Sequence, residues 1–274
     1  MIELPEAAAL AAQARERLSG RTVTAAEAHR TPHRLMWFSG DPATYRDLLT
    51  GAVITGAQGI AGHVQLEAGD LRIVLSDGAY PRWFAPGEPV PDRHQLRLDL
   101  DDGGTLVVVV AMYGGIQVFH DGENDNPYYL AAVQAPSPLG PDADAAWFTG
   151  LLDGSDRLPA KAFLATEQRI PGLGNGVLQD ILWTARVHPR RRVGTLGAAE
   201  RDALHGAVLG TLRAMTAAGG RDTERGLLGR PGGYATVMSR ATLGLPCPRC
   251  GGARTKGTYL GGAVYVCEGC QPLG

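Results

Sequence analysis

Four cysteines near the C-terminal end of the chain constrain its fold more than any other feature. They form two pairs, Cys247-x-x-Cys250 and Cys267-x-x-Cys270, with residues 251–266 between them. This spacing is typical of a site in which four thiolates close a tetrahedron around one Zn²⁺. A tail so poor in large apolar residues needs such a link to fold. Two disulfides or free thiols are the alternative, and the reducing conditions of the cytoplasm disfavour disulfides.

The predicted metal site is structural. A closed four-cysteine site leaves no open position for water, so we expect the single Zn²⁺ to hold a β-hairpin in shape. Many zinc ribbons contact proteins and not nucleic acid, so this motif alone does not identify a function.

The length and composition predict a soluble protein of two domains. The chain has 274 residues, of which 44% are hydrophobic and 20% charged, and it has no apolar run of about 18 residues. Acids lie where a secretory signal has basic residues, so we expect a cytoplasmic protein with no membrane partner. The net charge is −2, yet arginines are frequent between Arg186 and Lys256. They form either a nucleic-acid-binding patch or an ordinary solvated surface, and charge alone does not decide.

The first half of the chain is predicted to be a helix followed by β-strands. Pro5 begins a helical pattern that ends at Leu18, before Gly20. Period-two segments follow, and the clearest is a hairpin around Asp101-Asp102-Gly103-Gly104. The expected strands are 35–38, 64–66, 71–75, 94–100 and 105–110.

The second half is predicted to be helical. Residues 124–144 are rich in Pro, Asn, Asp and Gly, which is typical of a connection between domains. Beyond them, apolar residues recur at helical spacing in 177–185 and 204–215. The sequence therefore predicts an α+β fold in three parts: an N-terminal helix plus β-sandwich domain (1–130), a helical domain (131–235) and a zinc-finger β-hairpin (236–274).

A glycine-rich turn precedes the first of these helices. Gly174 and Asn175 lie in Pro-Gly-Leu-Gly-Asn-Gly directly before the helical pattern, where backbone N–H groups and the helix dipole favour an anion. Lys161, a little upstream, could add charge to the same phosphate. An ordinary helix cap explains such a turn equally well.

Three motifs resemble one known family. The segment from Ile170 to Pro189 looks like the helix-two-turn-helix of formamidopyrimidine-DNA glycosylases and endonuclease VIII enzymes. Glu3-Leu4-Pro5-Glu6 with its helix is similar to that family's N-terminus, and the hairpin ending Cys270-Gln-Pro is similar to its zinc finger. Because the motifs agree in order and spacing, the chain is identified as a divergent member of this superfamily.

The resemblance implies a two-domain enzyme of base excision repair that binds damaged double-stranded DNA and flips a modified base into a pocket. Lys161 and Asn175 then fall on the family's phosphate-binding positions. Asp180 stands where that helix usually has a glutamate. We expect a monomer in the cytoplasm, associated with the nucleoid.

The chain departs from the family at three positions. The family's nucleophile is an N-terminal proline, and position 2 here is Ile2. The family's β-domain lysine is missing, since Lys161 and Lys256 are the only lysines. The arginine near the hairpin tip is replaced by the segment around Gly262. The residue that fills the gap left by a flipped base is also hard to identify, with Tyr113 as the best candidate and Met112 beside it.

Glu3 and Glu6 remain as candidate catalytic groups. A carboxylate next to the sugar can stabilise oxocarbenium character or activate a water, which a hydrolytic glycosylase without an amine nucleophile requires. An acid in a first helical turn also serves the dipole. The first hypothesis is therefore a monofunctional DNA glycosylase with doubtful lyase activity. The alternatives are a non-catalytic binder of abasic or distorted DNA and a glycosylase/lyase that uses the Met1 amine.

Overall fold

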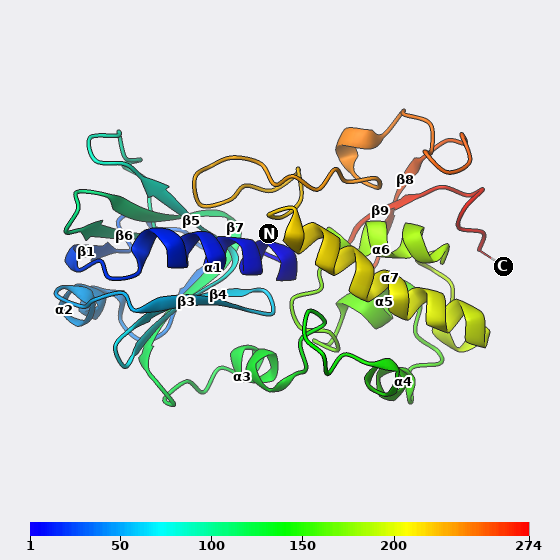
Figure 1. Ribbon diagram of the computed structural model, residues 1–274, viewed down its shortest axis with the longest axis horizontal. Helices are drawn as coiled ribbons and strands as arrows, with labels where there is room; N and C mark the ends of the chain where they lie inside the picture. The colour runs from blue at the N-terminus through cyan, green and yellow to red at the C-terminus, as the bar shows by residue number, and fades with distance from the viewer. Residues whose placement is uncertain (274) are drawn as a thin grey trace. The chain divides into compact units, whose positions relative to one another are not determined.

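The computed structural model describes residues 1–273, which form two compact units. Unit 1 comprises residues 1–133 together with 224–232, and unit 2 comprises 134–223 and the chain from 233 onward. A short segment from late in the sequence is thus part of the unit built by the N-terminal half. Figure 1 shows the helices and strands of both units. No helix among residues 1–273 is long and apolar enough to cross a membrane.

Unit 1 consists of a long helix on a curved β-sheet with short helices at its edges. Its elements, with α3 at its end, are α1 (Leu4–Leu18), β1 (Val23–Ala28), β2 (Met36–Phe38), the 3-10 turn η1 (Pro42–Thr44), α2 (Tyr45–Leu49), β3 (Gly56–Ile60), β4 (His63–Ala68), β5 (Leu71–Phe84), β6 (Leu96–Leu100), β7 (Thr105–His120) and α3 (Pro127–Gln134).

The sheet of unit 1 is built around two long antiparallel strands, β5 and β7. The strand order is β1-β6-β7-β5-β4-β3, and β2 adds to β7 in parallel. The register of β5 against β7 shifts between Asp77 and Ala79, an irregularity of the kind that bends the bulged strand. This irregularity lies beside the N-terminus of the chain, because the Ile2 N–H donates a hydrogen bond of 2.6 Å to the Asp77 carbonyl.

The core of unit 1 lies between α1 and the sheet. Pro5 occupies the first turn of α1, where its missing N–H has no helical partner to lose. Leu10, Ala14 and Leu18 repeat at helical spacing and are buried in one cluster with residues of β3, β4 and β5. The predicted helix is therefore confirmed, and it begins at Leu4.

Unit 2 consists of short helices and a β-hairpin. Its elements are α4 (Ala145–Leu152), α5 (Ala160–Ala165), α6 (Val177–Ala185), η2 (Val193–Thr195), α7 (Ala198–Ala217), η3 (Arg240–Thr242), β8 (Thr255–Tyr259) and β9 (Gly262–Val266). The two helical faces predicted from the sequence are confirmed, since α6 and α7 pack together through them. Left-handed backbone at Gly219 and Gly220 ends α7, as expected from the sequence.

Candidate functional site

Two buried carboxylates mark the start of α1. Glu3 is the N-cap residue in extended conformation, with φ −114° and ψ 177°, and its side chain is only 5% exposed. Glu6, one turn later, is also buried, and both residues have an interaction partner. Burial of a carboxylate is costly unless it is paired. Acids that serve only the helix dipole are ordinarily solvated, so the burial of Glu3 and Glu6 favours a more specific role.

Tyr113 lies close to the first of these carboxylates. Burial, together with the charges of Asp77 and Glu3, raises the pKa of the Tyr113 hydroxyl. Asp77 has a left-handed backbone with φ 58°, a conformation that Asp tolerates better than most residues. A Cβ on the next residue, Gly78, would lie 2.5 Å from the Tyr113 carbonyl oxygen, so glycine is needed for this approach of β5 to β7.

Sequence reasoning missed Asp77. The available signal was Gly78 within an otherwise regular strand pattern, since an isolated strand glycine indicates a bulge or a close backbone approach. Tyr113, by contrast, was selected as the candidate gap-filling residue, and it is partly exposed. Its neighbour Met112 is 63% exposed, so both side chains are accessible from solvent.

The amino group of Met1 is held by a residue from the late segment of unit 1. Its nitrogen lies 3.3 Å from a carboxylate oxygen of Glu224, and the Tyr80 hydroxyl donates a hydrogen bond to the same carboxylate. The Tyr113 hydroxyl contacts the Met1 sulfur at 3.0 Å. No feature of the sequence pointed to Glu224, because it is brought to the N-terminus only by the tertiary fold.

In unit 2 the structure brings Lys161 and Asn175 together at the β8–β9 hairpin. The Lys161 side chain is 4% exposed, and its Nζ donates a hydrogen bond of 2.6 Å to the Tyr259 carbonyl. Burial lowers the pKa of Lys161. Asn175 Nδ2 donates to the Ala263 carbonyl at 3.2 Å. Both side chains selected from the sequence thus contact the backbone of the hairpin.

The hairpin tip is fitted closely to these two side chains. A Cβ on Gly262 would lie 3.1 Å from Lys161 Nζ and 3.2 Å from Asn175 Oδ1. Gln179 of α6, which sequence reasoning missed, fixes the hairpin further: its Nε2 donates to the Ala263 carbonyl at 3.1 Å and its Oε1 accepts from the Tyr265 N–H at 3.0 Å. The carbonyl of Gly174 accepts the Leu178 N–H at 3.2 Å and so caps the start of α6.

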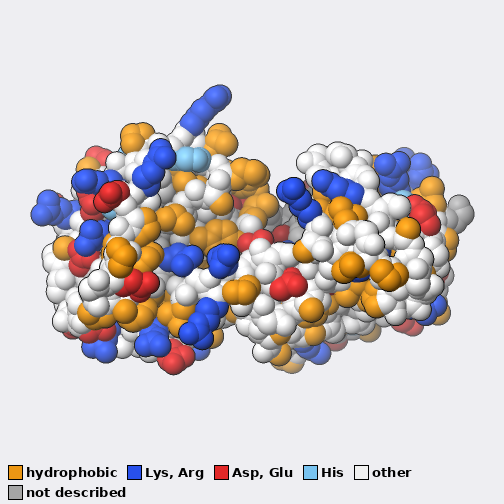
Figure 2. Space-filling model, turned by 90° about the horizontal axis from the view of Figure 1, so that it is seen from above, with side chains coloured by type: hydrophobic (Ala, Val, Ile, Leu, Met, Phe, Trp, Pro, Cys, Tyr) orange, Lys and Arg blue, Asp and Glu red, His pale blue; other side chains and the backbone are white. Residues whose placement is uncertain are grey.

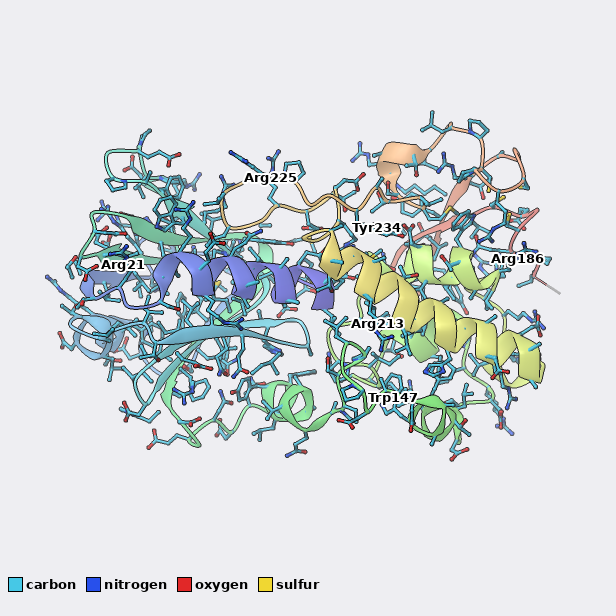
Figure 3. All side chains as sticks on the ribbon, in the orientation of Figure 1. Arg21, Trp147, Arg186, Arg213, Arg225 and Tyr234 are labelled. Carbon is cyan, nitrogen blue, oxygen red and sulfur yellow. The ribbon has the colours of Figure 1, made fainter. Side chains whose placement is uncertain are left out.

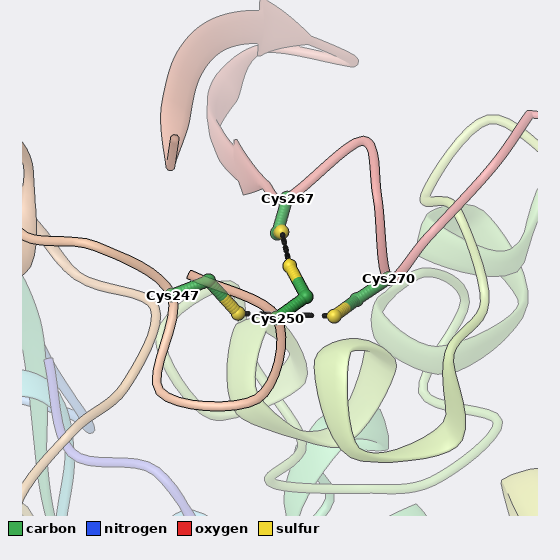
Figure 4. A group of neighbouring side chains, drawn as sticks. All are labelled: Cys247, Cys250, Cys267 and Cys270. Carbon is green, nitrogen blue, oxygen red and sulfur yellow. Dashed lines mark hydrogen bonds between the residues drawn. The ribbon is translucent and has the colours of Figure 1, made fainter. Parts of the chain in front are cut away.

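The four cysteines lie together and could hold a metal ion (Figure 4). All four sulfurs are within 4.8 Å of one another, with Cys247 and Cys270 at 3.7 Å and Cys250 and Cys267 at 3.4 Å. A tetrahedral Zn²⁺ with bonds of about 2.3 Å separates its sulfurs by roughly 3.8 Å. The cysteines are not joined by disulfides, and the cluster fits a tetrahedral ion.

The environment of the sulfurs favours a thiolate at Cys247 and disfavours one at Cys270 unless a cation is bound. Although burial opposes it, backbone N–H groups of Arg249 and Cys250 lower the pKa of Cys247 to about 6. Burial and the neighbouring sulfurs raise the pKa of Cys270 to about 12. Trp183 Nε1 also donates to the Cys247 sulfur at 3.4 Å. Crowded thiolates of this kind need a cation to remain charged together.

Asp180 ties α6 to the segment that leads into the hairpin. Its two carboxylate oxygens accept hydrogen bonds from the backbone N–H groups of Val237 at 2.9 Å and Met238 at 2.7 Å. Burial nevertheless raises the pKa of this carboxyl above its usual value. Asp180 therefore has a structural role. The observation that it replaces the family's usual glutamate did not reveal this role.

The C-terminal arginines do not form a uniform patch. On the face drawn in Figure 2, Lys and Arg side chains are interspersed with acidic and apolar ones in both units. Several are used internally: Arg221 is buried, Arg249 lies over the Trp183 ring at 4.0 Å, and Arg191 pairs with Glu200. Only some of the arginines counted in the sequence are therefore available to an outside partner.

Comparison with curated proteins shows full-length relatives. A formamidopyrimidine-DNA glycosylase of Symbiobacterium thermophilum is 30% identical, and the match covers 100% of this chain and 90% of the relative. One of Rhizorhabdus wittichii is also 30% identical, over 99% of this chain and 100% of the relative. No protein-family model matches the chain.

Solved structures of the same fold were crystallised with damaged DNA. A Lactococcus lactis FPG variant in complex with Fapy-dG-containing DNA superposes with a TM-score of 0.85 at 23% identity, over 98% of this chain and 99% of that one. MutM in complex with carbocyclic 8-oxo-G DNA gives a TM-score of 0.84 at 24% identity, with the same coverage. The α+β fold with its C-terminal four-cysteine hairpin is confirmed, and from the full-length relatives we conclude that the chain belongs to the formamidopyrimidine-DNA glycosylase family.

Proposed function

We propose that this protein is a DNA repair glycosylase that binds damaged duplex DNA, flips out a modified base and excises it with water as the nucleophile. The observation that carries the proposal is the bonding of the nitrogen of Ile2. The Ile2 nitrogen is a peptide nitrogen whose N–H donates to the Asp77 carbonyl, so it has no basic lone pair for attack on a sugar. Glu3, buried one residue later, is the acid that can act in its place.

In this proposal Glu3 stabilises the oxocarbenium character that develops as the base leaves with the electron pair of the glycosidic bond. Glu3 then accepts a proton from the water that bonds to the sugar carbon, and this proton is returned to the released base. Tyr113 and Asp77 shape the surroundings of that carboxylate. Glu6 supports the same region from within α1. Tyr113 and the exposed Met112 fill the gap left in the duplex by the flipped base.

In unit 2, Lys161 and Asn175, with the turn that contains Gly174, bind the backbone phosphates that position the lesion. The four cysteines hold one structural Zn²⁺, which maintains the hairpin against Lys161 and Asn175 and takes no part in the reaction. In sequence order we place the β domain at 1–130, the helical domain at 131–235 and a separate zinc finger at 236–274, with residues 224–232 returning to the unit of the β domain. Action on chromosomal DNA as a monomer would place the protein in the cytoplasm with the nucleoid.

The test is direct detection of released base. Purified protein would be incubated with duplexes that carry oxidised, alkylated or deaminated bases, and the free base would be identified by mass spectrometry. Release of one base class by wild type, and none by Glu3→Gln, supports the proposal. If no base is released from any duplex while abasic DNA is bound in a gel shift, the protein is a lesion binder and the proposal is wrong.

A second candidate is a lyase that uses the Met1 amine. It is favoured by one observation, the placement of this amine 3.3 Å from a carboxylate oxygen of Glu224, which could accept its proton before attack. Borohydride reduction during reaction with abasic DNA would then trap a covalent complex, and Glu224→Gln would slow trapping. Absence of a trapped complex under conditions of base release removes this candidate.

A further inference from the structure

The hairpin tip lacks an arginine, and the structure supplies one from a different element beside it. The guanidinium of Arg190 lies over the Tyr259 ring, with its central carbon 4.9 Å from the ring centroid. Tyr259 is the last residue of β8, and its carbonyl accepts the hydrogen bond from Lys161 Nζ. One hairpin residue therefore contacts the cationic side chains of both Arg190 and Lys161.

The backbone around Arg190 is fixed in place. The Arg190 N–H donates to His188 Nδ1 at 3.1 Å, and the Pro189 carbonyl accepts the Lys161 N–H at 3.0 Å. The Arg191 carbonyl accepts the Ala160 N–H at 2.8 Å. These bonds attach the segment 188–191 to the start of α5, so the backbones of Arg190 and Lys161 are held together.

Neither cation is neutralised. Among residues 1–273, no ion pair includes Arg190 or Lys161. Lys161 is almost wholly buried with one carbonyl as its hydrogen-bond acceptor, which is a costly arrangement for an ammonium. The Arg190 side chain is exposed, and stacking on an aromatic ring leaves the guanidinium edge open for hydrogen bonds. An outside anion could bind the open edge of the exposed Arg190 guanidinium, and its negative charge would also offset that of the buried Lys161 ammonium nearby.

We propose that Arg190, held by Tyr259, binds a DNA backbone phosphate and takes over the charge that the tip of the hairpin lacks at Gly262. This inference rests on the proposed function, because it assumes that duplex DNA is the partner of unit 2. A planar guanidinium is suited to two hydrogen bonds to one phosphate. The neighbouring Lys161 and Asn175 would contact the same stretch of backbone.

The experiment measures binding and not catalysis. Affinity of the full-length protein for a duplex with a tetrahydrofuran abasic analogue would be determined over a salt series. Each phosphate contact contributes about 0.9 to the slope of log K against log salt concentration. Arg190→Ala should lower this slope by about one and weaken binding at low salt by roughly tenfold, whereas Arg213→Ala on α7 (Figure 3), which removes the same charge from another exposed position, should change neither.

The stacking partner gives a second, independent comparison. Tyr259→Leu removes the ring and should weaken binding in the same direction, while Tyr259→Phe keeps the ring and should match wild type. Tyr259→Leu should add nothing in the Arg190→Ala background if the ring acts through Arg190. Unchanged melting temperatures would show that the variants fold.

The outcomes separate this inference from the proposed function. An unaltered salt slope in Arg190→Ala overturns the inference even if the wild type releases base. A lowered slope supports it even if no base is released, in which case the hydrolytic proposal fails alone. Failure of the wild type to bind the duplex at all would overturn both.

Discussion

At the scale of single residues, the candidate site of unit 1 depends on how carboxylates surround the N-terminus. Glu3 was identifiable from the sequence because it stands directly before a helix with a clear start. Asp77 and Glu224 were not identifiable. Asp77 is oriented by an irregularity of its strand, and Glu224 reaches Met1 only through a tertiary contact between residues far apart in the sequence. Residues next to a local motif are therefore predictable, and those placed by long-range packing are not.

Removal of the Glu3 charge should strongly slow base excision without unfolding the protein. A general acid–base group contributes about 10²- to 10⁴-fold to a rate, so Glu3→Gln should lower the single-turnover rate of base release by that order. Glu16→Gln changes an exposed acid on the same helix and should have no effect. Equal rates for Glu3→Gln and wild type would show that another group performs the chemistry.

Lys161 should make DNA binding sensitive to alkaline pH. Burial lowers the pKa of this side chain, so its positive charge is lost at a lower pH than the roughly 10.4 of an exposed lysine. Affinity for duplex DNA should therefore decrease as the pH rises through that lowered value. A titration of affinity from neutral to alkaline pH checks this.

Two variants serve as controls for the pH dependence. Lys161→Met has no charge to lose and should bind weakly with a flatter profile. Lys256→Met alters an exposed lysine of the hairpin and should keep the wild-type profile. A Lys161→Met profile as steep as that of wild type would assign the pH dependence to other groups.

At the scale of elements, the regular helices and the cysteine hairpin could be predicted and the long strands could not. The helical faces of α6 and α7 repeat without interruption, which makes them visible in the sequence. The pairing of β5 with β7 is irregular after Asp77, and the strands contain Gly78 and Gly114, so their alternation is broken and only their first parts were recognised. β1 and β3 were missed because small residues such as Ala and Gly dominate them.

Metal removal should unfold the hairpin selectively. The buried residues near the cysteines are few, so the proposed zinc supplies much of the stability of this part. The purified protein should contain one Zn²⁺ per chain. After removal by a strong chelator, hydrogen exchange should accelerate in β8 and β9 and stay unchanged in β5 and β7. Full protection of β8 and β9 in metal-free protein would contradict a structural metal.

At the scale of the whole molecule, the two units are not two consecutive halves of the sequence. Residues 224–232 return to unit 1, where the Trp83 N–H donates to the Leu227 carbonyl at 2.9 Å and the Leu227 N–H donates to Gln13 at 2.7 Å. Leu227 itself is fully buried in the core of unit 1. No local pattern predicts such a return, because its partners lie far away in the chain.

Truncation of Leu227 should therefore destabilise the unit formed by the N-terminal half. Leu227→Ala leaves a cavity in the core and should cost about 2–5 kcal/mol of the free energy of unfolding. The adjacent Leu228 is 41% exposed, and Leu228→Ala should change stability by less than about 0.5 kcal/mol. Hydrogen exchange should report the loss in β5 and β7, and a loss confined to α6 and α7 would contradict this division of the chain.

The measurement that tests the central claim most directly is a comparison of base loss with strand breakage on one end-labelled duplex. Once a released base identifies a substrate, each time point would be divided and analysed with and without hot alkali. The proposed chemistry at Glu3, with Ile2 in place of an amine, predicts breaks that appear only after alkali. Breaks of equal yield without alkali would show that the protein cleaves the strand itself, and water could not then be its only nucleophile.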